Sequence, residues 1–304
     1  MYGVAISVIS CLRADTGVHV AWLVESEGLP DIDPTEAIAI TPGGGRMGGL
    51  AGGLLDAHLP DLHTGSDGML VQVEMTATDA LIAGVPEGGR ATLAVVPGSA
   101  LPEQIWPLLL ERRPLAVSAS VDGRRLTDLT LHLPGTDDEL IGELLGRDRT
   151  TSVLTDQRLV TAFVPVPRLA IFGGGPIAGA LADAARLLGW QIAGSGDPDT
   201  AAGHMAGLAG TDVAVIMGHD VESSSRVLGA ALESGAGYIG SLGSLRMQQQ
   251  RADWLAYRGV TDLDRVHGPA GIDIDARTPA EIALSVLAEA VAVRNRASTE
   301  PASQ

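Results

Sequence analysis

A strand, a glycine-rich turn and a helix follow one another between Leu169 and Gly189, and this unit constrains the fold more than any other part of the sequence. The letters read LAIF, then GGGPIA, then an apolar helical pattern, which gives the spacing G-x-G-x-x-A of a dinucleotide-binding turn. Gly173 permits the tight turn, Gly175 lets the backbone approach a pyrophosphate, and Ala178 is small enough for the helix to pack on the strand. The amino terminus of the helix attracts phosphate groups. The unit therefore predicts a Rossmann-like parallel sheet with a nucleotide-binding turn.

The segment Pro165–Pro167 marks the expected domain boundary, because two prolines around one residue stiffen an extended linker. A chain of 304 residues is long enough for two domains that each bury a core. We therefore expect an α/β protein in which a mixed α/β domain (1–164) precedes a Rossmann-like domain (165–297) and a flexible tail (298–304).

The first domain is expected to combine strands and helices. Runs of β-branched and other apolar residues indicate strands, a period near 3.6 indicates helices, and Asp122-Gly123 suits the tight turn of a hairpin. The expected strands are Val4–Cys11, Val18–Glu25, Ala37–Thr41, Met69–Met75, Ala91–Val96, Leu115–Val121, Leu126–Leu133 and one or two within Thr151–Val164. The expected helices are Leu50–Leu59, Pro102–Arg113 and Asp137–Leu145.

The second domain continues with further strands and helices after its glycine turn. Thr278-Pro279-Ala280-Glu281 is a capping box with proline at the first helical position, which is a specific start signal for the last helix. The expected strands are Leu169–Phe172, Ala214–Met217, Tyr238–Ile239 and Gly271–Asp275, and the expected helices are Ser224–Ser234, Arg246–Arg258 and Pro279–Arg294.

Charge and composition exclude several classes of function. A net charge of −17 repels nucleic-acid phosphates and anionic lipid, and no apolar run approaches the roughly 20 residues of a membrane span. Cys11 is the single cysteine, which excludes a disulfide framework and a cysteine-built zinc site. All 20 basic residues are arginine, so arginine is the only strong cation that can hold an anion. These properties predict an acidic cytoplasmic protein that binds neither nucleic acid nor membrane.

His219 and Asp220 are the candidate catalytic residues, because they follow a buried strand whose carboxyl end faces the ligand crevice of a parallel sheet. A histidine at that place can act as an acid or base near neutral pH. The alternative interpretation is that these residues cap the next helix.

Two further groups are candidates for cofactor binding. Asp197 follows the expected second strand of this domain, Gln191–Gly196, at the place where a carboxylate binds ribose in dinucleotide-binding domains; the alternative is a solvated loop carboxylate. The stretch Gly240–Arg246 is a second glycine–serine turn before a helix, and its candidate ligands are Gly240, Ser241, Gly243, Ser244 and Arg246. Its alternative role is structural.

Asp273 and Asp275 alternate with apolar residues, so the expected strand places both carboxylates on one face. Such a pair suits a cation or an arginine, although a solvated edge is the more common role. The histidines show no metal-ligand spacing, so no metal site is expected.

Four stretches of the second domain carry a family resemblance: Leu169–Leu181 (LAIFGGGPIAGAL), Ile216–Asp220 (IMGHD), Gly237–Arg246 (GYIGSLGSLR) and Val266–Glu289 (VHGPAGIDIDARTPAEIALSVLAE). On these residues the chain resembles the XdhC/CoxI family of xanthine dehydrogenase accessory proteins. The first domain is similar more faintly, through Ile38–Asp56 and Ala83–Ala94.

This resemblance implies a Rossmann-like second domain, a homodimer, and a function in maturation. Such proteins bind the molybdenum cofactor, a molybdopterin, and assist its sulfuration and insertion into molybdenum hydroxylases. The leading hypothesis is therefore a non-catalytic factor that delivers this cofactor to a molybdenum hydroxylase of the xanthine dehydrogenase type. The alternative is an NAD(P)-dependent oxidoreductase acting on a small-molecule substrate, which the glycine turn Gly173–Ala178 favours.

The chain departs from the family pattern at positions that carry chemistry. Leu54 and Glu87 stand where cysteine is usual in the family, Pro176 stands where a histidine is common, and Gly196 replaces the first of two aspartates. The resemblance therefore implies the fold and the cofactor class, but no thiol ligand at Leu54 or Glu87.

Overall fold

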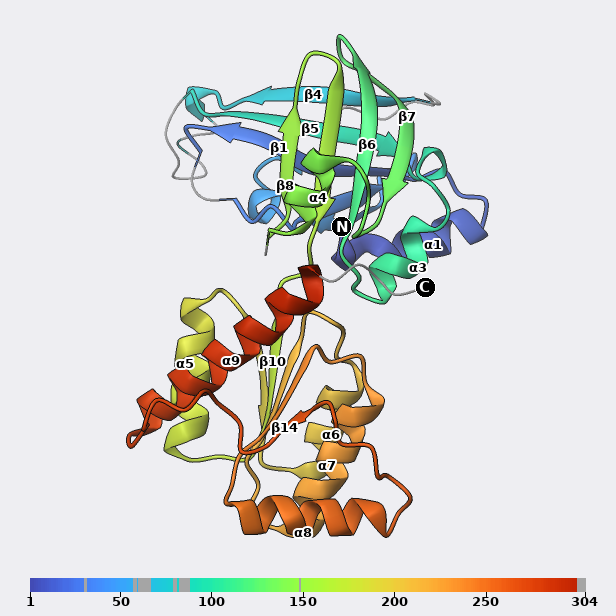
Figure 1. The fold of residues 1–304 in the computed structure, drawn as a ribbon. Coiled ribbons are helices and arrows are strands. Elements are labelled where there is room, and N and C mark those ends of the chain that lie inside the picture. Colours follow the sequence, from blue (N-terminus) through green and yellow to red (C-terminus); the bar gives the residue numbers. More distant parts are fainter. Residues whose placement is uncertain are drawn as a thin grey trace. The chain divides into compact units, whose positions relative to one another are not determined.

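The computed structural model describes residues 1–29, 32–56, 59, 67–78, 81, 88–147 and 149–299. The chain forms two compact units, Met1–Pro165 (unit 1) and Val166–Gln304 (unit 2), each with its own sheet and cores (Figure 1). None of the helices in these ranges is long and apolar enough to cross a membrane.

Unit 1 is built on an antiparallel sheet whose nine described strands lie in the order β3-β2-β1-β5-β4-β7-β6-β9-β8. The strands are β1 (His19–Glu27), β2 (Ala37–Ile40), β3 (Arg46–Gly49), β4 (Gly68–Glu74), β5 (Arg90–Pro97), β6 (Leu115–Asp122), β7 (Arg125–His132), β8 (Thr151–Leu154) and β9 (Arg158–Phe163). The helices are α1 (Ala5–Arg13), α3 (Ile105–Leu110) and α4 (Glu139–Leu145). The predicted hairpin is confirmed as β6 and β7, with Gly123 at a φ of 60° in its turn.

The sheet of unit 1 curls, so that its last strands return toward β1. The Trp22 indole N–H of β1 donates to Thr161 Oγ1 of β9 at 3.0 Å, and the Trp22 and Phe163 rings meet edge to face at 5.6 Å. The largest core of the unit lies on this concave face, where α1 and α3 add Val8 and Trp106. Burying these apolar side chains is the main stabilising contribution to the curled sheet.

The prediction of a strand at Val4–Cys11 is wrong, because most of this segment forms α1. Val4 and Val8 are buried four residues apart, whereas Ile6 between them is 65% exposed. That burial follows the helical period, and a short apolar run does not distinguish the two periods by composition alone.

The prediction of a helix at Leu50–Leu59 is also wrong for its described part. Strand β3 ends at Gly49, and Ala51–Gly53 form one turn of 3-10 helix. Gly52 and Gly53 have φ angles of 63° and 95°, which an α-helix does not contain. Ala57, His58 and Pro60 lie outside the described residues.

Unit 2 contains a parallel sheet of five described strands in the order β11-β10-β12-β13-β14. This is a doubly wound order, and it confirms the predicted Rossmann-like fold. The strands are β10 (Arg168–Phe172), β11 (Gln191–Ser195), β12 (Val213–Ile216), β13 (Tyr238–Ser241) and β14 (Val266–His267). The helices are α5 (Pro176–Leu187), α6 (Pro198–Ala206), α7 (Val221–Glu233), α8 (Leu245–Ala256) and α9 (Pro279–Thr299).

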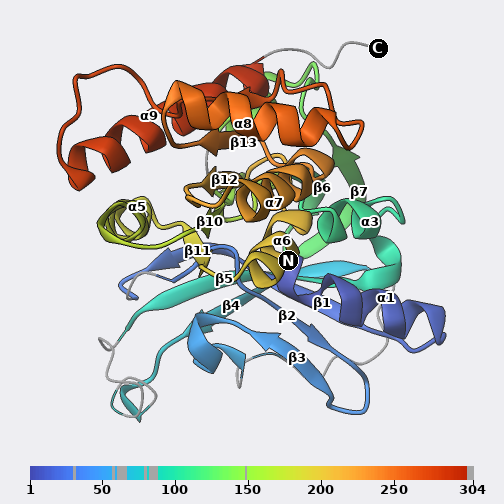
Figure 2. The ribbon, with the colours of Figure 1, turned by 90° about the horizontal axis from the view of Figure 1, so that it is seen from below.

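Helices cover both faces of this sheet (Figures 1 and 2). Alternate residues of β10 point to opposite faces: Leu169 and Ile171 belong to the core with α5 and α9, and Ala170 and Phe172 to the core with α6, α7 and α8. A strand buried on both faces reads as the continuous apolar run seen in the sequence.

Two elements of unit 2 differ from the sequence predictions. The strand expected at Gly271–Asp275 is wrong, because this segment is irregular and the edge strand is the two-residue β14. Asp275 has a φ of 54°, which is incompatible with a strand. Helix α6 was not predicted, although Asp197 and Pro198 supply its cap and its first position.

Candidate functional site

The carboxyl-terminal edge of the unit 2 sheet brings the predicted site segments together. Phe172, Ile216 and Ser241 pair in register on β10, β12 and β13, so the loops that follow these strands begin side by side. The connection from β11 crosses to the far side of β10, which places the change of strand order between β10 and β12. In open parallel sheets ligands bind outside the strand ends at this point.

The first glycine turn has the geometry of a phosphate cradle. Gly173 has a φ of 114° and donates its N–H to the Ser195 carbonyl at 3.0 Å, which connects the ends of β10 and β11. Gly175, with a φ of 90°, is the N-cap residue of α5, and no side chain caps this helix. A Cβ at Gly174 or Gly175 would meet no atom within 4 Å, so the turn faces open space, while Ala178 packs against the core beneath. The turn thus presents free N–H groups of a helix terminus.

The loop after β12 is fixed by packing and by a helix cap. A Cβ at Gly218 would stand 2.4 Å from Phe172 Cε1, so only glycine fits there. Asp220 Oδ2 accepts the Ser223 N–H at 2.7 Å and caps α7, and this hydrogen bond lowers the pKa of the Asp220 carboxyl. His219 is exposed, and within the described ranges nothing hydrogen-bonds to its ring. The structure thus gives Asp220 a capping function and leaves the catalytic role of both residues as a prediction.

The loop after β13 forms the second turn predicted from the sequence. Ser241 is fully buried, Gly243 has a φ of 130°, and Ser244 caps α8 through its Oγ and the Met247 N–H at 3.3 Å. Gly240 lies against Tyr238, whose ring leaves no room for a Cβ. Arg246 is exposed in the first turn of α8, without an ion pair to any described residue.

Arg251 holds the strand ends together, and the sequence did not predict this role. Its side chain is 1% exposed and donates to Ser224 Oγ, Ser241 Oγ and the carbonyls of Leu242 and Gly218, at 2.6–3.0 Å. These acceptors come from α7, from β13 and from the loops after β13 and β12. Within the part of the chain that the structure describes, no carboxylate pairs with this guanidinium, and burial lowers its pKa. The helical period could have indicated its burial, because Arg251 lies four residues before the buried Leu255 and so on the same inner face of α8.

Gln248 adds to this network from the same helix. Its Nε2 donates to the Ser241 carbonyl at 2.8 Å, while Ser241 Oγ donates to Gln248 Oε1 at 2.7 Å. The α8 side chains therefore hold the ends of β12 and β13 at fixed positions, beneath an exposed helix terminus. These donors are bound to protein oxygens, so this network positions the loops, and the exposed helix terminus supplies the N–H groups that an anion could accept from.

A second polar cluster lies between β13, β14 and α9. Glu289 accepts the Tyr238 O–H at 2.6 Å and the Gly271 N–H at 2.7 Å, and its Oε1 lies 3.3 Å from His267 Nδ1. The Tyr238 and His267 rings stack at 4.7 Å. Burial alone would raise the pKa of Glu289, but the hydrogen bonds from Tyr238 and Gly271 outweigh it and lower that pKa. Burial raises the pKa of Tyr238, so its hydroxyl stays a donor.

Asp197 and the pair Asp273 and Asp275 have local partners. Asp197 Oδ1 accepts the N–H and the Oγ1 hydroxyl of Thr200 at 2.8 and 2.7 Å, which caps α6 and lowers the pKa of Asp197. Asp275 Oδ2 accepts from Arg277 at 2.7 Å, and Asp273 Oδ1 accepts the Asp275 N–H at 3.3 Å. The cation site considered for this pair is therefore not formed as a strand face. The described residues contain no group of three or more metal-ligand side chains.

In unit 1, Leu54 is half-buried against the core on the convex face of the sheet and makes an apolar contact there. Glu87 lies outside the described residues.

Comparisons with known proteins agree with this architecture. A family model described as the XdhC Rossmann domain matches residues 169–290. The chain is 36% identical over 135 residues to the molybdenum cofactor insertion chaperone PaoD of Escherichia coli K12, covering 43% of this chain and 42% of PaoD. It is 32% identical over 155 residues to the uncharacterized protein YqeB of the same organism, covering 43% of this chain and 28% of YqeB. The chain thus matches less than half the length of either curated relative.

A solved structure described as a xanthine dehydrogenase from Bacillus halodurans aligns with 99% of this chain and 97% of its own length. The identity is 18% and the TM-score 0.47.

Proposed function

The second unit of this chain belongs to the XdhC family, and from that premise we propose that the protein binds a molybdopterin-type cofactor and delivers it to a molybdenum hydroxylase client. The observation that carries the proposal is the 36% identity to a molybdenum cofactor insertion chaperone. The identity of the client, and a cytoplasmic homodimer as the working form, are parts of the same proposal.

The residues at the unit 2 edge suit the phosphate that a molybdopterin carries. The turn at Gly174 and Gly175 is open where a Cβ would stand, and it presents helix N–H groups. Arg251 places a positive charge beneath the neighbouring loops without a carboxylate partner in the described part of the chain. A buried cation that lacks a counter-ion favours an anion nearby.

In this proposal the protein binds, shields and hands over the cofactor, and the cofactor supplies the redox chemistry of the client. The chain's own residues hold the phosphate through backbone N–H groups and the field of Arg251. Leu54 offers no thiol, so the proposal includes no sulfur transfer through that position.

The test uses the full chain produced in a host that makes molybdopterin, with bound pterin measured by fluorescence after oxidation. We expect the wild-type protein to retain the cofactor. The Gly174→Asp variant should retain about tenfold less, because a carboxylate in the open turn repels phosphate. The matched Gly174→Ala variant adds a methyl group without charge and should bind like the wild type. A wild-type protein without bound molybdopterin, together with unchanged client activity in a deletion strain, would overturn the proposal.

The same glycine turn favours NAD(P)-dependent oxidation of a small molecule as the second candidate function. Asp197 would be the ribose ligand in that case, although its Oδ1 already caps α6. Calorimetric titration with NAD(H) and NADP(H) separates the two candidates. Saturable dinucleotide binding that Asp197→Ala weakens supports the second one, whereas a flat titration rejects it.

A further inference from the structure

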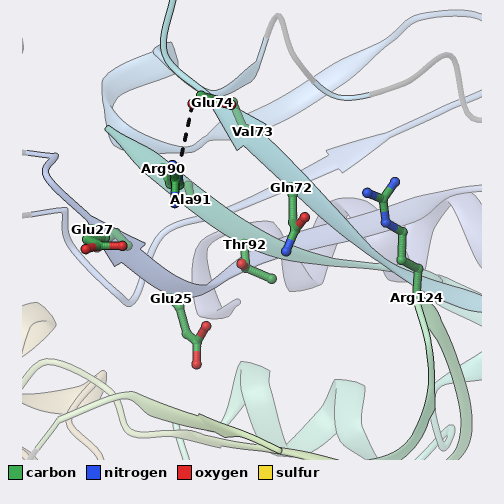
Figure 3. A pocket seen from close by; sticks show the side chains of 10 residues that line it. Glu25, Glu27, Gln72, Val73, Glu74, Arg90, Ala91, Thr92 and Arg124 are labelled. Atoms are coloured by element: carbon green, nitrogen blue, oxygen red, sulfur yellow. Dashed lines mark ion pairs between the residues drawn. The ribbon is translucent and has the colours of Figure 1, made fainter. Parts of the chain in front are cut away.

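Unit 1 contains a polar cavity of about 810 Å³ that the proposed function has not used (Figure 3). It lies over β1, β5 and β4, and its volume falls within the roughly 300–1,000 Å³ of small-molecule sites. The cavity continues the concave face of the curled sheet, at the end where that face changes from apolar to polar.

Strand register explains why polar side chains line this cavity. Trp22, Ala94 and Leu70 form one row across β1, β5 and β4, and all three belong to the large core. A bulge between Leu23 and Glu25 then shifts the alternation of β1. Because of this bulge, Glu25 and not Ser26 continues the concave face.

The next row on this face is Glu25, Thr92 and Gln72, and the row after it is Glu27, Arg90 and Glu74. Figure 3 shows Glu25, Thr92 and Gln72 on three neighbouring strands.

The two rows differ in their charges. In the outer row Arg90 Nε lies 3.8 Å from Glu74 Oε1, and Glu27 stands opposite Arg90. In the inner row Glu25 has no cation opposite it, and it forms no ion pair with any described residue. Glu25 is therefore the carboxylate of the cavity that is most available to a ligand.

Arg124 supplies a positive charge at the other end of the inner row. It reaches the cavity from the turn between β6 and β7, and its carbonyl accepts the Leu70 N–H at 2.7 Å, two residues before Gln72. Its guanidinium has no ion-pair partner in the described ranges. Glu25 and Gln72 are two strand spacings apart, about 10 Å, which is room for a bicyclic ring, and Arg124 lies beyond β4 at the end of this row.

We propose that this cavity binds a 2-amino-4-oxopyrimidine ring that carries an anionic substituent. The amino and ring N–H groups of such a ring are adjacent donors, which a carboxylate accepts in the bidentate manner that it accepts from arginine. Glu25 accepts from this edge, Thr92 and Gln72 contact the ring between, and Arg124 pairs with the anion. The preference for this ring over other polar heterocycles rests on the proposed function, because a pterin is the ring of molybdopterin.

Ligands of a single charge fit the cavity less well. A cationic ligand would be attracted by Glu25 and Glu27 but repelled by Arg124. A purely anionic ligand would be attracted by Arg124 but repelled by Glu25 and Glu27. A ligand with neutral N–H donors on one edge and an anionic substituent on the other can bind to Glu25 and to Arg124 at the same time.

Two kinds of ligand carry such a ring with an anionic substituent, a pterin and a guanine nucleotide, and the experiment distinguishes them. Binding of 6-carboxypterin to the full chain is followed by its fluorescence, with 6-carboxylumazine as the control that lacks the 2-amino group. Binding of GMP is followed by calorimetry, with IMP as the matching control. We expect 6-carboxypterin to bind about tenfold more tightly than 6-carboxylumazine. A preference for GMP over 6-carboxypterin would assign the cavity to the nucleotide.

Variants locate the binding site within the cavity. Glu25→Gln and Arg124→Gln should each weaken 6-carboxypterin binding about tenfold, because each removes a charge-assisted hydrogen bond. Glu103→Gln makes the same charge change outside this cavity and should have no effect. Binding that survives both cavity variants, or a folded wild-type chain that binds neither 6-carboxypterin nor GMP, would overturn the inference.

Molybdopterin retention, measured in parallel, separates this inference from the proposed function. A chain that retains molybdopterin but binds neither test ligand contradicts the cavity assignment alone. A chain that binds 6-carboxypterin through Glu25 but retains no molybdopterin contradicts the proposed function and supports the cavity assignment.

Discussion

At the scale of single residues, Arg251 and Glu289 show how unit 2 holds one buried and one half-buried charge. Arg251 satisfies its donors with neutral oxygens, whereas Glu289 accepts from a phenol and a backbone N–H beside an imidazole. Both arrangements follow the rule that a buried charge must be hydrogen-bonded. The two residues respond differently to pH: the guanidinium of Arg251 stays charged, whereas the carboxylate of Glu289 becomes neutral when it is protonated.

Glu289 therefore makes the stability of unit 2 depend on acid pH. Its pKa is lower in the folded chain than the ordinary 4.5, so the unfolded chain takes up the proton first. This contribution is fully present above pH 4.5 and is lost as the pH falls through the folded-state pKa.

Urea unfolding at several pH values checks this prediction. The Glu289→Gln variant should have a lower unfolding midpoint than the wild type at pH 7, and the difference should shrink as the pH falls below about 4.5. The Tyr238→Phe variant keeps the carboxylate but removes a hydrogen bond that lowers its pKa, so its stability should depend less on pH than that of the wild type. A difference between wild type and Glu289→Gln that is the same at pH 7 and pH 4 would contradict the assignment.

At the scale of elements, helix caps occupy two carboxylates that the sequence offered as site residues and one that it predicted as part of a capping box. Asp197 and Asp220 cap α6 and α7, and Glu281 accepts the N–H groups of Arg277 and Thr278 at the start of α9. An aspartate after a strand suits a ligand or a cap equally well by composition, because both functions use a carboxylate near free N–H groups.

The Asp220 cap gives a prediction that distinguishes these two functions. Asp220→Asn keeps a side-chain acceptor for the Ser223 N–H, whereas Asp220→Ala removes it. We expect thermal melting to show Asp220→Ala a few degrees below the wild type, and Asp220→Asn close to it. Molybdopterin retention should be unchanged in Asp220→Asn if capping is its function. Loss of retention in a normally stable Asp220→Asn protein would restore a direct ligand role.

Long-range partners limited what the sequence could predict. The parallel sheet was predictable, because LAIF before a glycine turn combines local periodicity with a backbone requirement. The cluster of Tyr238, His267 and Glu289 was not, since its hydrogen bonds join residues 22 and 51 positions apart. Local signals also failed at Val4–Cys11, where only tertiary burial separates helix from strand.

The cavity of unit 1 shows the same limit more sharply. No period in the sequence places Glu25 and Arg124 at the ends of one row, because that depends on a bulge in β1 and on strand pairing across the sheet. The glycine turns could be recognised from the sequence because their chemistry is local, whereas the residues of this cavity could not.

At the scale of the whole molecule, the chain contains two sheets with separate cores. The described cores of unit 1 draw only on residues before the Pro165 boundary, and those of unit 2 only on residues after it. Cores that are formed within one unit should unfold with that unit, because domains with their own cores behave as cooperative units.

Calorimetry of the full chain should therefore resolve two transitions, which variants assign to the units. Arg251→Met leaves the Gly218 and Leu242 carbonyls buried without this donor, so it should destabilise unit 2 by about 3 kcal/mol and lower one transition by roughly 10 °C. Trp22→Phe removes the hydrogen bond to Thr161 and should lower only the other transition. If Arg251→Met prevents unit 2 from folding, Ser224→Ala removes a single acceptor and gives a smaller shift of the same transition. A single transition that both variants lower equally would show that the units unfold together.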